Sequence, residues 1–73
     1  MTIKLPVLTA DQILAILKRH GFEAVRQSGS HVILRNPDGR RTTVPLHKGR
    51  DLGKGLVRQI MRDANLTVDD LKL

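Results

Sequence analysis

Histidines are the residues of this sequence best suited to chemistry, and His31 stands out by its position. It follows Gly29 and Ser30 and begins a stretch in which Val32 and Leu34 alternate with other residues. Because successive side chains of a strand point to opposite faces, this alternation places Val32 and Leu34 in a core and His31 on the open side. An exposed imidazole exchanges protons near neutral pH, as general acid–base catalysis requires. The alternative from spacing alone is a surface histidine at the start of a strand.

The other two histidines differ in what they could contribute. His47 follows Pro45 by two positions, and near His31 it would act as a general acid or contact a phosphate; the alternative is a loop histidine with no special role. His20 closes a predicted helix, where a protonated ring suits the helix dipole, so we interpret it as structural. The three histidines lie 11 and 16 residues apart and cysteine is absent. This spacing is unlike that of zinc sites, so we expect no metal and no cofactor.

The charge distribution favours a polyanionic partner. Thirteen Lys and Arg against seven Asp and Glu give a net charge of +6, and the segment from Arg26 to Arg62 has nine basic and two acidic residues, or +7. Such a field attracts phosphate polyanions or an acidic protein, although net charge also keeps small proteins soluble. Phe22 is the single aromatic residue, so the stacking platform of single-strand binders is missing. We therefore expect that any RNA bound by this protein is held by its sugar–phosphate backbone.

RNA is a substrate on which one histidine can act without a metal. Its 2′-hydroxyl is a nucleophile adjacent to phosphorus, so a base that removes its proton, or an acid that protonates the leaving oxygen, promotes cleavage. Nearby cations stabilise the transition state. Arg26 and Arg35, on neighbouring predicted strands, would flank His31 on the open face, and Lys48 and Lys54 lie near the start of a second predicted helix. Together they form a cluster of cations, although any one of them alone would be an ordinary solvated side chain.

The elements that position these residues are marked by clear boundaries. A first helix is predicted over residues 10–20, because Thr9 and Gln12 have capping-box spacing and Gly21 supplies a left-handed residue after its end. Strands are predicted over residues 22–27, 31–35 and 40–44, separated by turn-forming residues.

A second helix is predicted with Asp51 as its N-cap and Asn65 just past its end. The order helix, three antiparallel strands, helix predicts an α+β fold in which both helices cover one face of the sheet and the other face stays open.

Length and composition narrow the class of protein. The 73 residues suit one domain, which we expect to span residues 1–73. The absence of cysteine suits a reducing compartment. No apolar run is long enough to span a membrane or to form the core of a signal peptide. We expect a cytoplasmic protein without membrane contact.

Several motifs, taken together in this order, resemble the HicA family. They are Leu5–Pro6–x–Leu8–Thr9, His20–Gly21–Phe22, Arg26–Gln27–Ser28–Gly29–Ser30–His31, Val44–Pro45–x–His47, Asp51–Leu52–Gly53–Lys54–Gly55–Leu56 and Ile60–Met61–Arg62–Asp63–Ala64–Asn65–Leu66–Thr67. The resemblance spans nearly the whole chain. It implies a fold like that of a double-stranded-RNA-binding domain and a toxin of a type II toxin–antitoxin system.

The resemblance also implies an activity and a partner. It implies an mRNA interferase that acts without the ribosome, and the family's catalytic histidine falls on His31. A HicB antitoxin would cover that histidine and bring a DNA-binding element, so that operator DNA would be reached only through the antitoxin. We expect RNA contacts from Arg26, Ser28, Gly29, Ser30, Arg35, His47, Lys48 and Lys54. The alternatives are a non-catalytic RNA-binding module and a protein whose basic face docks an acidic partner.

Overall fold

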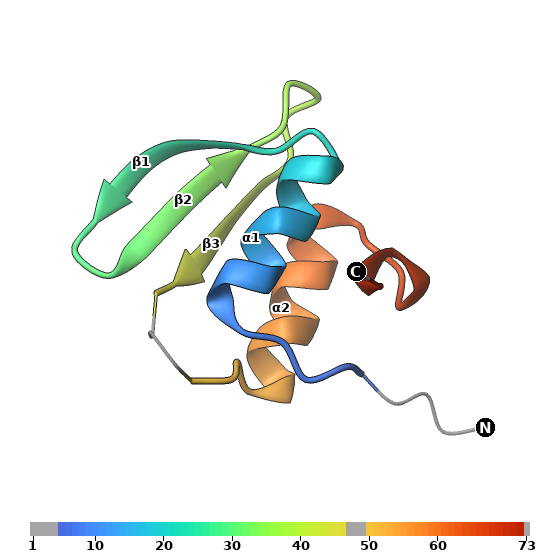
Figure 1. The fold of residues 1–73 in the computed structure, drawn as a ribbon. Coiled ribbons are helices and arrows are strands. Elements are labelled where there is room, and N and C mark those ends of the chain that lie inside the picture. The colour runs from blue at the N-terminus through green and yellow to red at the C-terminus, as the bar shows by residue number, and fades with distance from the viewer. Residues whose placement is uncertain (1–4, 47–49, 73) are drawn as a thin grey trace.

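Two helices pack on one side of a three-stranded sheet in a computed structural model, which describes residues 5–46 and 50–72 (Figure 1). The elements are α1 (Ala10–Arg19), β1 (Glu23–Ser28), β2 (His31–Arg35), β3 (Arg41–Pro45), α2 (Lys54–Ala64) and the short 3-10 helix η1 (Asp69–Leu71). The strands are antiparallel in the order β1–β2–β3. The predicted α+β fold is confirmed, with β1 and β3 each beginning one residue later than expected.

Local sequence signals set the ends of α1 as predicted. The Thr9 hydroxyl accepts a hydrogen bond of 3.3 Å from the backbone N–H of Gln12, and the Gln12 side chain accepts one of 2.9 Å from the backbone N–H of Thr9. Gly21 has a φ of 89°, a left-handed value that lets the chain reverse after the helix. The backbone N–H of Phe22 then donates to the carbonyl of Leu17 at 3.0 Å. This turn carries the buried Phe22 ring into the core.

The start of α2 differs from the prediction. Asp51 is not its N-cap; α2 begins at Lys54, and Gly53 is the N-cap without a side-chain hydrogen bond. Asp51 instead forms an antiparallel bridge with Thr9, and the backbone N–H of the buried Leu52 donates to the carbonyl of Leu8 at 2.7 Å. This pairing holds the chain extended, so the helix starts later. Its end is as predicted, at a left-handed Asn65 with a φ of 55°.

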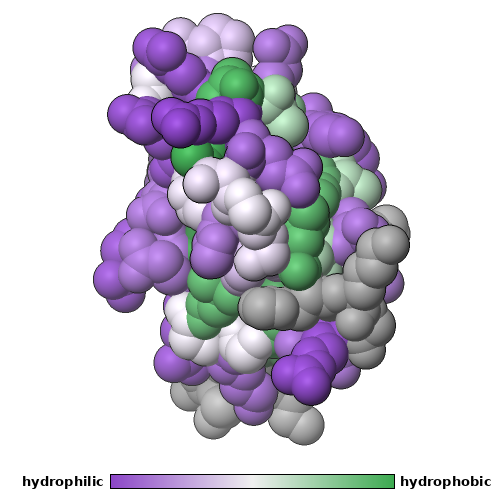
Figure 2. Space-filling model, turned by 90° about the vertical axis from the view of Figure 1, so that its left-hand side faces the viewer, coloured by the Kyte–Doolittle hydropathy of each residue, from purple (hydrophilic) through white to green (hydrophobic). Residues whose placement is uncertain are grey.

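The core lies between the helices and the sheet. Its most buried side chains are Phe22, Ile13, Ile16, Leu17, Leu34, Ile60, Leu71, Val44 and Val57. Both helices contact β3, whereas every residue of β1 is exposed. Seen from the β1 side, the surface is mostly hydrophilic with narrow apolar patches (Figure 2). No helix within residues 5–46 and 50–72 has the length and apolar character needed to cross a membrane.

Candidate active site

His31 is the first residue of β2 and follows a tight turn. Ser28 and His31 are paired across β1 and β2, which leaves Gly29 and Ser30 as a two-residue turn. Gly29 has a φ of 59°, and glycine at the first central position is what a type II′ hairpin turn requires. His31 is exposed, whereas Val32 is buried. The predicted alternation along β2 is thus confirmed, and the two-residue turn sets the position of His31 at the start of the strand.

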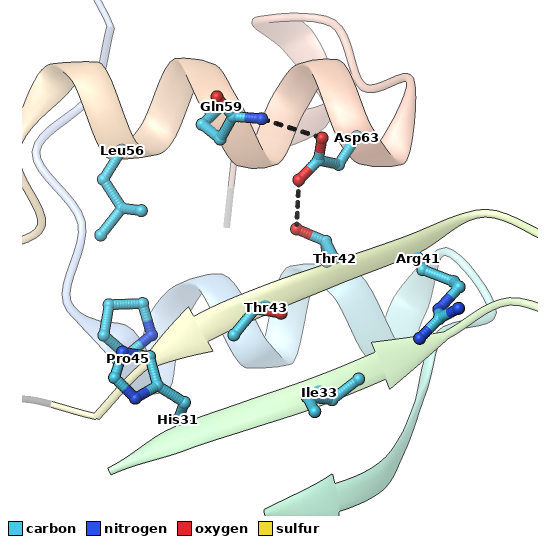
Figure 3. A pocket seen from close by; sticks show the side chains of 9 residues that line it. All are labelled: His31, Ile33, Arg41, Thr42, Thr43, Pro45, Leu56, Gln59 and Asp63. Atoms are coloured by element: carbon cyan, nitrogen blue, oxygen red, sulfur yellow. Dashed lines mark hydrogen bonds between the residues drawn. The ribbon is translucent and has the colours of Figure 1, made fainter. Parts of the chain in front are cut away.

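His31 lies at one end of a hollow of about 450 Å³ on the sheet face away from α1 (Figure 3). The floor and ends come from β2 and β3, and α2, which runs alongside β3, supplies one wall. The lining residues are His31, Ile33, Arg41, Thr42, Thr43, Pro45, Leu56, Gln59 and Asp63. The face that the sequence predicts to be open is therefore bordered on one side by a helix.

The three wall residues of α2 were not predicted as part of the site. Leu56, Gln59 and Asp63 follow one another at intervals of three and four residues, so they lie along one side of the helix. Asp63 accepts hydrogen bonds from the Thr42 hydroxyl at 3.3 Å and from the Gln59 side-chain amide at 3.0 Å. The bond from Thr42 ties α2 to β3 at the end of the hollow away from His31, and the bond from Gln59 holds the Asp63 carboxylate from within the helix (Figure 3).

A β-bulge determines the face on which Arg26 lies. Ala24 is opposite Leu34, whose side chain is buried in the core, but the register shifts at Val25. Arg26 is consequently opposite Ile33, on the same face as His31. In an unbroken strand Arg26 would share the face of Ala24, whereas the bulge places it opposite Ile33. Arg26 does not line the hollow beside His31 and instead borders a depression that it shares with Leu14 and Lys18 of α1.

Two further arginines lie on this face. Arg35 on β2 is directly opposite Arg41 on β3, and both are exposed. Arg35 is four residues after His31 on the same strand, so both share one face. The sequence predicts Arg26 and Arg35 beside His31, and the register places both on its face. Arg41 is not among the residues that the sequence predicts for the site.

A family comparison adds to this geometry. Residues 10–66, more than half of the chain, match the family model described as the HicA toxin of bacterial toxin–antitoxin systems. The chain belongs to the HicA toxin family. The family resemblance is thereby confirmed, and with it a toxin role that implies an antitoxin partner. A search of curated proteins gave no match.

Three of the remaining predicted contact residues of this HicA toxin directly precede His31 in the hairpin of β1 and β2. Ser28 lies opposite His31, and Gly29 and Ser30 form the turn between them. Lys54 is the exposed first residue of α2, half a turn before the wall residue Leu56. The predictions for His47 and Lys48 concern residues outside those that the structure describes.

The described part of the HicA toxin has few side chains that could serve together as metal ligands. Over residues 5–46 and 50–72, no group of three or more His, Cys, Asp or Glu side chains is arranged to hold a metal ion. The polar side chains that line the hollow are one imidazole, one arginine, two threonine hydroxyls, the Gln59 amide and the hydrogen-bonded carboxylate of Asp63.

Proposed function

We propose that this HicA toxin is a metal-independent endoribonuclease that cleaves mRNA and that His31 is its catalytic histidine. The observation that carries the proposal is the position of His31, exposed at one end of a hollow on a face that also holds Arg26, Arg35 and Arg41. An RNA backbone on this face would meet an acid–base group and several cations together. Both are what cleavage of a phosphodiester by its own 2′-hydroxyl requires.

In the proposed reaction the 2′-oxygen attacks the adjacent phosphorus and the bond to the 5′-oxygen breaks. His31 takes the proton of the 2′-hydroxyl, or in a one-histidine scheme donates a proton to the leaving 5′-oxygen. The bond formed between the 2′-oxygen and phosphorus leaves a 2′,3′-cyclic phosphate on one product and a 5′-hydroxyl on the other. Acid–base assistance of this kind contributes about 100- to 10,000-fold to a rate.

The other residues bind the RNA. Arg26, His47 and Lys48 contact or neutralise the reacting phosphate, and His47 is the candidate donor to the leaving oxygen. Ser28, Gly29, Ser30, Arg35 and Lys54 bind the backbone on either side. In support, the bulge at Val25 orients Arg26 to the face of His31, and α2 carries no acidic residue in its first turn to repel a phosphate.

A HicB-like antitoxin that covers His31 is the proposed partner. The His31 face is exposed, and among residues 5–46 and 50–72 the ion pairs do not involve Arg26, Arg35 or Arg41, so an acidic protein surface would complement its charge. Operator DNA is bound only through that antitoxin. Because the antitoxin would bind the folded toxin and not the unfolded chain, adding the antitoxin raises the melting temperature of the toxin by mass action.

The experiment that tests the activity is cleavage of a defined single-stranded RNA by purified toxin in EDTA, with analysis of the product ends. Fragments with a 2′,3′-cyclic phosphate and a 5′-hydroxyl are expected. Fragments with a 3′-hydroxyl, or cleavage that EDTA abolishes, would contradict the mechanism. RNA that is bound but left intact would point instead to the non-catalytic RNA-binding module.

A further inference from the structure

Arg35 and Arg41 form a pair of like charges that the fold itself does not require. They are directly opposite on β2 and β3, with their side chains on the same exposed face. Residues paired in this way have Cβ atoms about 5 Å apart, so two guanidinium groups there repel each other and destabilise the sheet. Glu23 is opposite Arg35 on β1, but the ion pairs found within residues 5–46 and 50–72 are Arg40–Asp38 and Lys72–Asp69.

We propose that Arg35 and Arg41 bind a second phosphate of the same RNA strand, away from the bond that is cut. The inference rests on the proposed function and adds a contact that the sequence did not indicate, that of Arg41. Guanidinium groups bind phosphate oxygens in a two-pronged geometry, and the monoanionic phosphodiester of an RNA strand between two of them offsets part of their mutual repulsion. An anion bound between the two side chains is therefore stabilised by both of them.

The hollow connects this pair to His31. Arg41 lines its end away from His31, and Ile33 and Thr43, themselves a register pair, form the floor between (Figure 3). Arg35 lies four positions after His31 on β2, or about 13 Å at the usual rise of a strand. A single RNA strand covers this length with a few nucleotides. The wall residue Gln59 on α2 confines that strand to the sheet face.

The two sites together define the substrate as an RNA longer than a dinucleotide. A dinucleotide has one phosphodiester, which the His31 end occupies, so it gains nothing from Arg35 and Arg41. The contacts are to phosphates and not to bases, and the sole aromatic residue, Phe22, is buried. The second site therefore increases affinity with little dependence on base sequence.

The test compares Arg41→Gln with Arg58→Gln in a His31→Ala background that leaves RNA intact. Arg58 is a matched control because it is also exposed and lines a different depression with Leu5 and Met61. Binding is measured for a dinucleotide and for an RNA of about twelve nucleotides, a length typical of small single-strand-binding domains. In Arg41→Gln, the factor by which the longer RNA binds more tightly than the dinucleotide falls roughly tenfold. For the longer RNA, the slope of log Kd against log salt concentration falls by about 0.7. Arg58→Gln keeps the full gain.

Thermal unfolding without RNA provides a second readout. Because the substitution relieves a repulsion, Arg41→Gln melts at the same temperature as its parent or higher, whereas a residue needed for folding would lower it. If the longer RNA binds equally well to Arg41→Gln, or if Arg58→Gln loses as much, the second site is wrong while the proposed function stands. If the parent protein binds neither RNA, both proposals are overturned.

Discussion

Asn36, in the turn between β2 and β3, donates a hydrogen bond of 2.9 Å from its side-chain amide to the backbone carbonyl of His20 at the end of α1. Its side-chain oxygen also accepts a hydrogen bond of 3.1 Å from the backbone N–H of Asp38. Asn36 is buried, and a Cβ added to Gly21 would lie 3.2 Å from its amide nitrogen. One side chain therefore joins the two turns at the end of the sheet remote from His31.

Replacing Asn36 should destabilise the protein in proportion to the bonds lost. Asn36→Ala removes both of these partly buried hydrogen bonds, and we expect a cost of about 1–3 kcal/mol in unfolding free energy. Asn36→Asp has nearly the same shape but cannot donate to His20, so it should cost at least as much. Urea unfolding measures both. An Asn36→Asp variant as stable as the parent would show that the bond to His20 contributes nothing.

Arg40 is predicted to stabilise the fold, in contrast to its neighbour Arg41. Its guanidinium forms an ion pair with Asp38 at 2.8 Å, donates to the carbonyl of Ala64 at the end of α2, and lies 5.2 Å from the centre of the Phe22 ring. Loss of these contacts in Arg40→Gln should cost about 1–3 kcal/mol. Thermal unfolding of Arg40→Gln and Arg41→Gln compares the two. Equal melting temperatures would contradict the distinct roles assigned to them.

Asp70 gives the folded protein a defined sensitivity to acid. Its carboxylate accepts a hydrogen bond of 2.8 Å from the backbone N–H of Thr67, and this bond, the Thr67 hydroxyl and the nearby His20 lower the pKa of Asp70. Since the unfolded chain then takes up the proton first, the stabilisation is present at neutral pH. It is lost as the pH falls below the ordinary aspartate range and through the lowered pKa.

Asp70→Asn should remove this part of the pH dependence. The measurement is the melting temperature of both proteins from about pH 5 to about pH 2, the window in which such a carboxylate titrates. The parent should lose stability more steeply than the variant over that window. Parallel curves would mean that the bond to Thr67 does not favour the charged carboxylate.

Local signals explain why much of the fold could be predicted. The capping box of Thr9 and Gln12 and the glycine at position 21 act within a few residues, so their geometry does not depend on the rest of the chain. The alternation along β2 is equally local, because a strand that buries Val32 must expose His31. These features placed the candidate histidine on the correct face.

What could not be predicted depends on contacts between distant segments. Asp51 has the residue type of an N-cap, but a bridge to Thr9 determines its conformation. The apolar side of α2 indicates from the sequence that one face of the helix is buried. It does not indicate that α2 runs alongside β3 and so brings Gln59 into the site. Arg41 shares a face with His31 because of the β2–β3 register, which depends on how many residues the turn between those strands uses.

The central claim is that His31 is the catalytic residue of an RNA-cleaving toxin, and the most direct test is the cleavage rate of His31→Ala. His20→Ala is the matched control, because it removes an imidazole at the end of α1 while keeping the backbone carbonyl that Asn36 binds. RNA affinity and melting temperature are measured in parallel to show that each variant folds and binds. We predict that His31→Ala loses at least about 100-fold in rate with RNA affinity retained, and that His20→Ala cleaves as the parent does. A folded His31→Ala protein that cleaves RNA at the parental rate would contradict the account.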